Sequence, residues 1–191
     1  MTSGGTDVCS VGIGGQGLHG GYGMSSHWKG LTLDWIIGAT VVLADGRVHE
    51  VSRDQNKDLL WALQGAGSAF GVVAELRFNT FDAPSNATVF SVTLNWNNEQ
   101  TIKNGLTGFR NFVKDNQPAE LNIRLNGNGQ GSSFEGVYYG STQQFNNAIQ
   151  PLLKSTGGTV RSARTVGWIE SLNSYANNER LDVTYPYNTV S

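Results

Sequence analysis

Ten of the first thirty residues are glycine, and this density restricts the amino-terminal segment more than any other feature of the chain. Glycine opposes helix formation and permits positive φ angles. We therefore expect an unusual backbone conformation here instead of packed helices or strands. Residues 12–17 match the dinucleotide fingerprint G-x-G-x-x-G, which needs a helix at its third glycine. The glycines that follow predict no helix, which argues against a Rossmann site. We expect either a loop whose N–H groups bind phosphate or a bend in a β-rich domain.

Charge and cysteine content exclude several classes of site. Thirteen basic and 15 acidic residues are spread along 191 positions, without a run of like charge that could follow a phosphate backbone. No apolar stretch reaches the roughly 18 residues of a membrane span. Neither nucleic acid nor membrane is therefore expected as a partner. The single cysteine, Cys9, excludes an internal disulfide, and the three histidines lack metal-ligand spacing, so no metal is expected.

The first half of the chain predicts strands with little helix. Residues 36–43 and 47–51 are rich in β-branched side chains and flank Asp45-Gly46, a hairpin signal. A short helix is expected over 58–64, ended by Gly65, and another strand over 70–78.

The second half predicts an antiparallel sheet covered on one face by helices. Strands are expected at 88–96, 121–126, 134–139 and 159–166, with helices at 99–116, after Ser141 and from Trp168. This β-α-β-β-α-β order is typical of an α+β fold. We place a domain boundary near 81–86, which divides the chain into residues 1–84 and 85–191.

Hydrophobic and polar periodicities add detail to these elements. On the first helix, apolar residues recur at helical spacing on one face: Ile102, Leu106, Phe109 and Val113. On the second helix, the predicted buried stripe is Phe145, Ile149, Leu152 and Leu153. On the strand 121–126, period two puts Asn122, Arg124 and Asn126 on one face. That polar row could bind the hydroxyl groups of a sugar. The alternative interpretation is that the row is the solvent-facing side of an antiparallel sheet.

Six motifs, taken in order, resemble the FAD-linked oxidases of the berberine-bridge-enzyme-like group, within the p-cresol methylhydroxylase (PCMH) type of FAD-binding domain. They are Val8-Cys9-Ser10-Val11-Gly12-Ile13-Gly14-Gly15, Gly20-Gly21-Tyr22-Gly23-Met24-Ser25-Ser26, Gly30-Leu31-Thr32-Leu33-Asp34, Val41-Val42-Leu43-Ala44-Asp45-Gly46, Asp58-Leu59-Leu60-Trp61-Ala62-Leu63 and Gly65-Ala66-Gly67-Ser68-Ala69-Phe70-Gly71-Val72-Val73. Within this group the chain is most similar to the fungal carbohydrate oxidases, the glucooligosaccharide oxidases.

The resemblance implies FAD as cofactor and assigns residues to it. Cys9 is expected to bond to carbon 6 of the isoalloxazine ring, because that is what the cysteine of this motif does in the family. The glycines implied to pass the FAD backbone are Gly12, Gly14, Gly15, Gly20, Gly21 and Gly23. Val72 and Val73 are implied to border the adenine through main-chain groups. Asp34 is expected to cap a turn.

The resemblance also implies an architecture and an activity. Residues 1–84 would be the second half of the FAD domain and residues 85–191 part of a substrate domain. The amino-terminal FAD subdomain and the carboxy-terminal segment would be missing, so no catalytic residue is assigned in this chain. The implied activity oxidises an alcohol, a carbohydrate hydroxyl, with dioxygen as acceptor to give hydrogen peroxide. Two alternatives are a non-catalytic protein that binds carbohydrate or a partner, and an inactive truncated oxidase. Secretion is implied by the family, and the triplet Asn86-Ala87-Thr88 is a glycosylation sequon.

Overall fold

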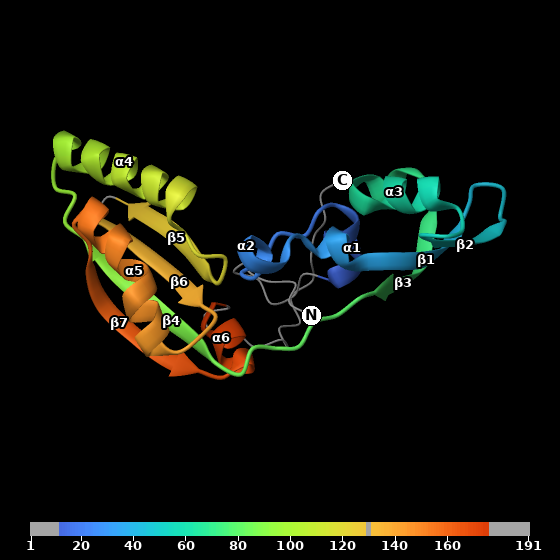
Figure 1. Ribbon diagram of the computed structural model, residues 1–191. Coiled ribbons are helices and arrows are strands. Elements are labelled where there is room, and N and C mark those ends of the chain that lie inside the picture. The colour runs from blue at the N-terminus through green and yellow to red at the C-terminus, as the bar shows by residue number, and fades with distance from the viewer. Residues whose placement is uncertain (1–11, 129–130, 176–191) are drawn as a thin grey trace, which may run out of the picture.

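Two antiparallel sheets form the framework of the protein. The computed structural model describes residues 12–128 and 131–175. A three-stranded sheet has the order β2-β1-β3 and a four-stranded sheet the order β5-β6-β4-β7. The two sheets lie at opposite ends of the molecule, and helices cover one face of each (Figure 1). All described strand pairs are antiparallel, which confirms the expected α+β class.

The first sheet is the predicted hairpin with one added strand. β1 (Ile36–Val42) and β2 (Val48–Ser52) are joined by the turn at Asp45-Gly46, where Gly46 has a φ of 82°. β3 (Val72–Phe78) pairs with the other edge of β1. α3 (Lys57–Ala66), followed by the short 3-10 helix η2 (Gly67–Ala69), lies over one face and buries Leu60 and Leu63 against the strands. The helix and the strand predicted for this region are thus confirmed, with bounds shifted by one or two residues.

The glycine-rich segment contains more helix than its sequence predicts. It contains α1 (Ile13–Leu18), α2 (Ser26–Lys29) and the 3-10 helix η1 (Thr32–Trp35), so the prediction of a segment without helix was wrong. Tertiary contacts explain the error: Leu18 packs on the first core, and a Cβ on Gly17 would lie 3.3 Å from Thr32 Cγ2. Such packing can outweigh a low helix propensity over one or two turns.

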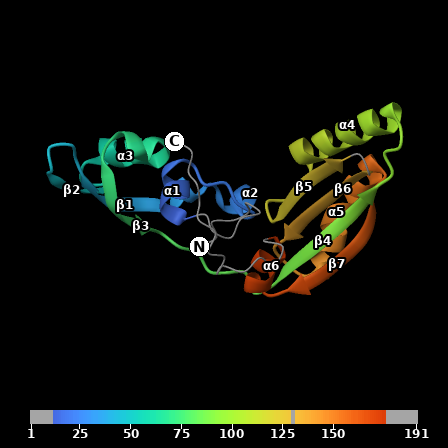
Figure 2. The same cartoon turned by 180° about the vertical axis from the view of Figure 1, so that it is seen from behind.

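The helices α4 and α5 cover one face of the second sheet, as predicted, and α6 packs at one end of the opposite face. The order is β4 (Ala87–Leu94), α4 (Glu99–Asp115), β5 (Leu121–Asn128), β6 (Gly131–Tyr138), α5 (Thr142–Thr156), β7 (Thr159–Val166) and α6 (Trp168–Tyr175). Figure 2, from behind, shows the strands in front of α5. Phe145, Ile149 and Leu152 of α5 are fully buried against β4, β5 and β6, and Leu153 is partly buried. The Ser141 side chain caps α5, as expected.

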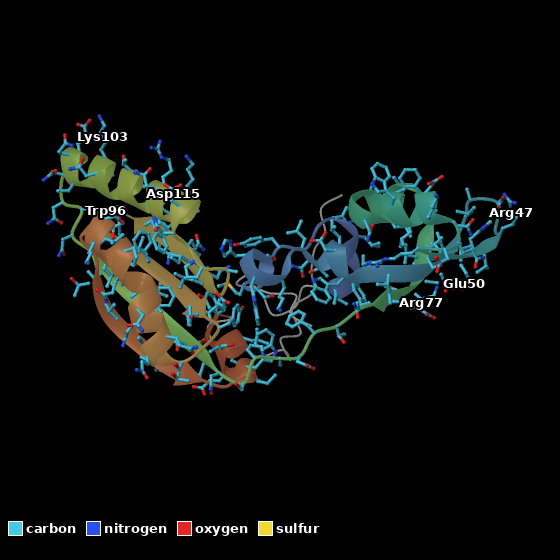
Figure 3. The ribbon with its side chains drawn as sticks, viewed as in Figure 1. Arg47, Glu50, Arg77, Trp96, Lys103 and Asp115 are labelled. Carbon is cyan, nitrogen blue, oxygen red and sulfur yellow. The ribbon has the colours of Figure 1, made fainter. Side chains whose placement is uncertain are left out.

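α4 packs on the sheet through Gly105, Phe109 and Phe112, and leaves the other three residues of its predicted apolar stripe half-exposed. Ile102, Leu106 and Val113 are all about 40% exposed, and Phe109 is partly buried. The buried positions are Gly105 and Phe112. Trp96 lies beside this helix (Figure 3), and a Cβ on Gly105 would lie 2.1 Å from its indole ring. The glycine therefore lets the helix approach closely enough to bury Phe112.

An aromatic bridge, defined as Trp28, Phe81, Tyr139 and Trp168, connects the two parts of the chain. Trp28 of α2 stacks on Tyr139, which follows β6, with 5.0 Å between ring centroids. Phe81, in the linker between β3 and β4, contacts Trp28 and Trp168 edge-on at 6.2 and 6.4 Å. The two sheets lie on either side of this linker. The sequence places the domain boundary in the same linker, and the division into 1–84 and 85–191 stays a prediction.

No helix within the described ranges is long and apolar enough to cross a membrane.

A glycine-to-alanine pair tests the close packing of α4. Gly105→Ala should destabilise the chain by about 1–3 kcal/mol, because overpacking against Trp96 exceeds the gain of about 1 kcal/mol in helix propensity. Gly14→Ala is the control, because a Cβ at that helical position meets no atom of the described residues within 4 Å. Urea unfolding should show a lower midpoint for Gly105→Ala alone. Equal midpoints for both variants would contradict the packing described here.

Candidate functional site

The glycines of α1 leave an open backbone edge in the segment that precedes the first sheet. A Cβ added to Gly12, Gly14 or Gly15 would meet no atom of residues 12–128 and 131–175 within 4 Å, so none of these residues blocks the approach of a ligand. Gln16, in the same helix, donates from Nε2 to the Tyr22 carbonyl at 3.0 Å. Its Oε1 is buried and has no hydrogen-bond partner within the described residues. An open glycine edge with an unpaired acceptor beside it is compatible with a polar ligand such as FAD.

The next three predicted glycines have structural roles of their own. Gly20 and Gly21 have φ angles of 111° and 82°, and a Cβ on Gly21 would lie 2.4 Å from Thr32 Cβ. Thr32 donates from its N–H and its hydroxyl to the Gly21 carbonyl, at 2.9 and 3.0 Å. The Gly23 N–H donates to Ser26 Oγ at 2.7 Å. This turn therefore requires glycine whether or not a cofactor binds, and contact between these residues and FAD stays a prediction.

The remaining predicted cofactor residues fall on an edge strand or outside the described residues. Val72 and Val73 begin β3 and pair with Val42 and Val41. β3 is at the edge of the first sheet as described, and alternate main-chain groups of an edge strand point away from its neighbour. The Val72 side chain is 70% exposed, so this end of the strand is accessible. Cys9 lies outside the described residues.

Asp34 caps a turn, as expected. The Leu31 N–H donates to its Oδ2 at 2.7 Å.

The predicted polar row of β5 lies on the face of the second sheet that α4 and α5 do not cover. The alternating residues Leu121, Ile123 and Leu125 pack into the helix-covered core, which confirms the predicted alternation. Arg124 is directly opposite Glu135 of β6, with 3.5 Å between Nη2 and Oε2. Asn126 donates to the same Glu135 oxygen at 2.7 Å. Asn122 is 4% exposed, so Arg124 and Asn126 are the accessible members of the row.

A cavity of about 220 Å³ opens on this polar face. It is bordered by the strands β4, β5 and β6, by Ser162 of β7, and by Ser174 and Tyr175 of α6. The Arg124 guanidinium lies 5.9 Å from the Tyr175 ring centroid. The Tyr175 hydroxyl is buried and has no hydrogen-bond partner among the described residues. The cavity therefore combines a cation, a carboxylate, hydroxyl groups and an aromatic ring.

Sequence reasoning missed Glu135 and Tyr175. Glu135 could have been found from its position, because it alternates with the buried Phe134 in a predicted strand beside the polar row. Tyr175 comes to the cavity only because α6 folds back over β4, and no local pattern predicts that contact.

No group of three or more histidine, cysteine, aspartate or glutamate residues that could hold a metal ion occurs within residues 12–128 and 131–175.

Comparison with known proteins identifies the relatives of this chain. No protein-family model matches it. It is 41% identical over 180 residues to a glucooligosaccharide oxidase of Sarocladium strictum, which covers 93% of this chain and 36% of the relative. A chitooligosaccharide oxidase of Gibberella zeae is 45% identical over 166 residues, covering 87% of this chain and 33% of the relative. The homologues of the present chain are carbohydrate oxidases and berberine-bridge-enzyme-like proteins. The resemblance predicted from the motifs is thus confirmed.

Solved structures of these oxidases have the same fold. A xylooligosaccharide oxidase of Myceliophthora thermophila, in complex with xylobiose, matches with a TM-score of 0.86 and 41% identity over 92% of this chain and 37% of that chain. A glucooligosaccharide oxidase of Acremonium strictum with a 6-S-cysteinyl, 8α-N1-histidyl FAD matches with a TM-score of 0.88 and 39% identity over 96% of this chain and 39% of that chain. The chain spans about a third of the length of the curated relatives it matches.

Burial of Tyr175 is expected to lower the stability of the folded chain at alkaline pH. Burial raises the pKa of its hydroxyl, and the nearby Arg124 opposes the shift only in part. The unfolded chain therefore loses this proton first, near pH 10, and above that pH the folded state holds more protons than the unfolded state. Stability contributed by the neutral hydroxyl is complete below about pH 10 and falls as pH rises further.

Tyr175→Phe should reduce this alkaline loss of stability. We expect urea unfolding between about pH 8 and about pH 11 to show a shallower decline for Tyr175→Phe than for the parent chain. Ser174→Ala, which changes a neighbouring side chain of α6 that does not ionise, is the control and should keep the parent slope. An unchanged slope for Tyr175→Phe would contradict the burial argument.

Proposed function

We propose that this chain is part of an FAD-dependent oxidase that oxidises a carbohydrate hydroxyl with dioxygen as acceptor, giving hydrogen peroxide. The observation that carries the proposal is identity of about 40% to several fungal oligosaccharide oxidases over about nine-tenths of the chain. The fold supports it, because solved oxidase structures superpose over the same extent. The activity of the whole protein is inferred from these relatives.

The first domain of the chain would hold the cofactor. FAD, when bound, supplies the hydride acceptor and is then reoxidised by dioxygen. The open edge at Gly12, Gly14 and Gly15 would let the backbone approach it closely. Cys9 would provide the covalent anchor, as implied by the cysteinyl FAD of the Acremonium strictum enzyme. The reactive form of a cysteine in such a bond is the thiolate.

The second domain would hold the sugar. Sugar hydroxyls need both donors and acceptors, and the cavity presents the guanidinium of Arg124 beside the carboxylate of Glu135. Because Asn126 and Arg124 both donate to Oε2, the other oxygen of Glu135 is the one best placed to accept from a ligand. The Tyr175 ring provides an apolar wall of the kind that packs on sugar rings. The same cavity would also support the alternative, a protein that binds carbohydrate without catalysis.

The location of the parent protein belongs to the same proposal. We propose that it is secreted, which the family resemblance supports.

Flavin binding is the first test. The purified chain is incubated with FAD and precipitated with acid, and visible flavin absorbance in the pellet is measured. We expect a coloured pellet for the parent chain and a colourless one for Cys9→Ser. Circular dichroism of both proteins confirms that each is folded before precipitation. A colourless pellet from folded parent chain would contradict flavin attachment by this chain, and sugar affinity in that same sample would favour the non-catalytic alternative.

Sugar binding is tested with two matched ion pairs. Glu135→Gln should weaken binding of gluco-, xylo- or chito-oligosaccharides about tenfold or more, because a hydrogen bond to a charged group contributes about 1.5–3 kcal/mol. Glu50→Gln is the control, since Glu50 forms a similarly exposed pair with Arg77 at 2.6 Å on the other sheet (Figure 3). Isothermal titration calorimetry of each variant measures the affinity. Equal losses in the two variants would place the sugar elsewhere.

A further inference from the structure

The triplet Asn86-Ala87-Thr88 occurs where the interdomain linker becomes the strand β4, and it is the single Asn-x-Ser/Thr sequon of the sequence. We propose that Asn86 is an N-glycosylation acceptor that carries an oligosaccharide at the rim of the second sheet. The inference rests on the proposed secretion of the parent protein, because only proteins that enter the secretory pathway meet the transferase. It does not depend on flavin binding or on the sugar cavity.

The position of Asn86 permits a bulky modification. The residue is exposed and precedes Ala87, the first residue of β4 that pairs with β7. Its side chain is therefore beyond the ladder of hydrogen bonds that holds the sheet together. Asn86 does not line the cavity beside Arg124 and Glu135. A glycan at this place would be solvated and would leave the polar face free.

The hydroxyl residue of the triplet is in the opposite situation. Thr88 is fully buried, and its Oγ1 donates to the Gly140 carbonyl at 2.9 Å. Thr165 Oγ1 lies 3.4 Å from the same atom. Recognition of a sequon requires both the asparagine and the hydroxyl residue, so the folded sheet conceals half of the signal. Glycosylation must therefore precede the pairing of β4 with β6 and β7.

The chemistry is a group transfer without a redox step. The Asn86 Nδ2 atom attacks the anomeric carbon of an oligosaccharide linked to dolichyl diphosphate. The bond from that carbon to the diphosphate oxygen breaks, dolichyl diphosphate leaves, and the amide nitrogen loses one proton. The product is a neutral N-glycosidic amide on an exposed side chain.

Translation of the full 191-residue chain behind a secretion signal, in the presence of microsomes, tests the proposal. We expect one upward shift in gel mobility that an endoglycosidase reverses. Asn86→Gln should lose the shift and Thr88→Ser should retain it, because serine keeps the sequon. An unshifted parent chain, or a shift that persists in Asn86→Gln, would overturn the proposal. Because the added signal forces entry, neither result depends on the native location or on FAD.

A second arm tests the order of folding and transfer. The chain is folded first without membranes and is then exposed to a detergent extract that contains the transferase and its lipid-linked donor. We expect no modification of the folded chain and modification of the urea-unfolded chain after dilution. Equal modification of both samples would show that the buried Thr88 is not protected and would overturn the inferred order.

Discussion

The stack of Trp28 on Tyr139 is a central contact between the glycine-rich segment and the second sheet. A stacked aromatic pair contributes about 0.5–1.5 kcal/mol beyond its burial. Its position matters more than that energy, because Trp28 belongs to the glycine-rich segment and Tyr139 follows a strand of the second sheet. Phe81 of the linker and Trp168 of α6 complete the same cluster. The proposed cofactor edge and the proposed sugar face are thus held by one aromatic bridge.

Alternation along β5 and β6 gives the second sheet its two faces. Residues such as Leu121 and Phe134 pack beneath α4 and α5, and this apolar core holds the strands in register. With that register, Arg124 stands opposite Glu135, and Asn126 reaches the same carboxylate. A slip of one residue would exchange the faces, burying the ion pair and exposing the core. The packing of the helices on one face therefore determines the chemistry of the other.

Glycine serves three physically different purposes in this chain. At Gly21 it accepts a positive φ against Thr32, at Gly105 it admits the Trp96 ring, and at Gly14 it leaves a helix surface open. The first two are required by the fold itself. No contact among the described residues explains the third, which is why we connect it with the cofactor. Counting glycines in the sequence could not separate these cases, because each depends on what the missing Cβ would touch.

The sequence by itself determined the strands, the caps and the alternation of both sheets, because period two, the Asp45-Gly46 turn and the Ser141 cap are local signals. Its motifs also determined the family resemblance. Only the tertiary structure decided that the glycine-rich segment is partly helical, that α4 buries Gly105 and Phe112 in place of most of its apolar stripe, and that Tyr175 reaches the polar face. Each of these depends on contacts between residues distant in the chain, where packing outweighs the local preference.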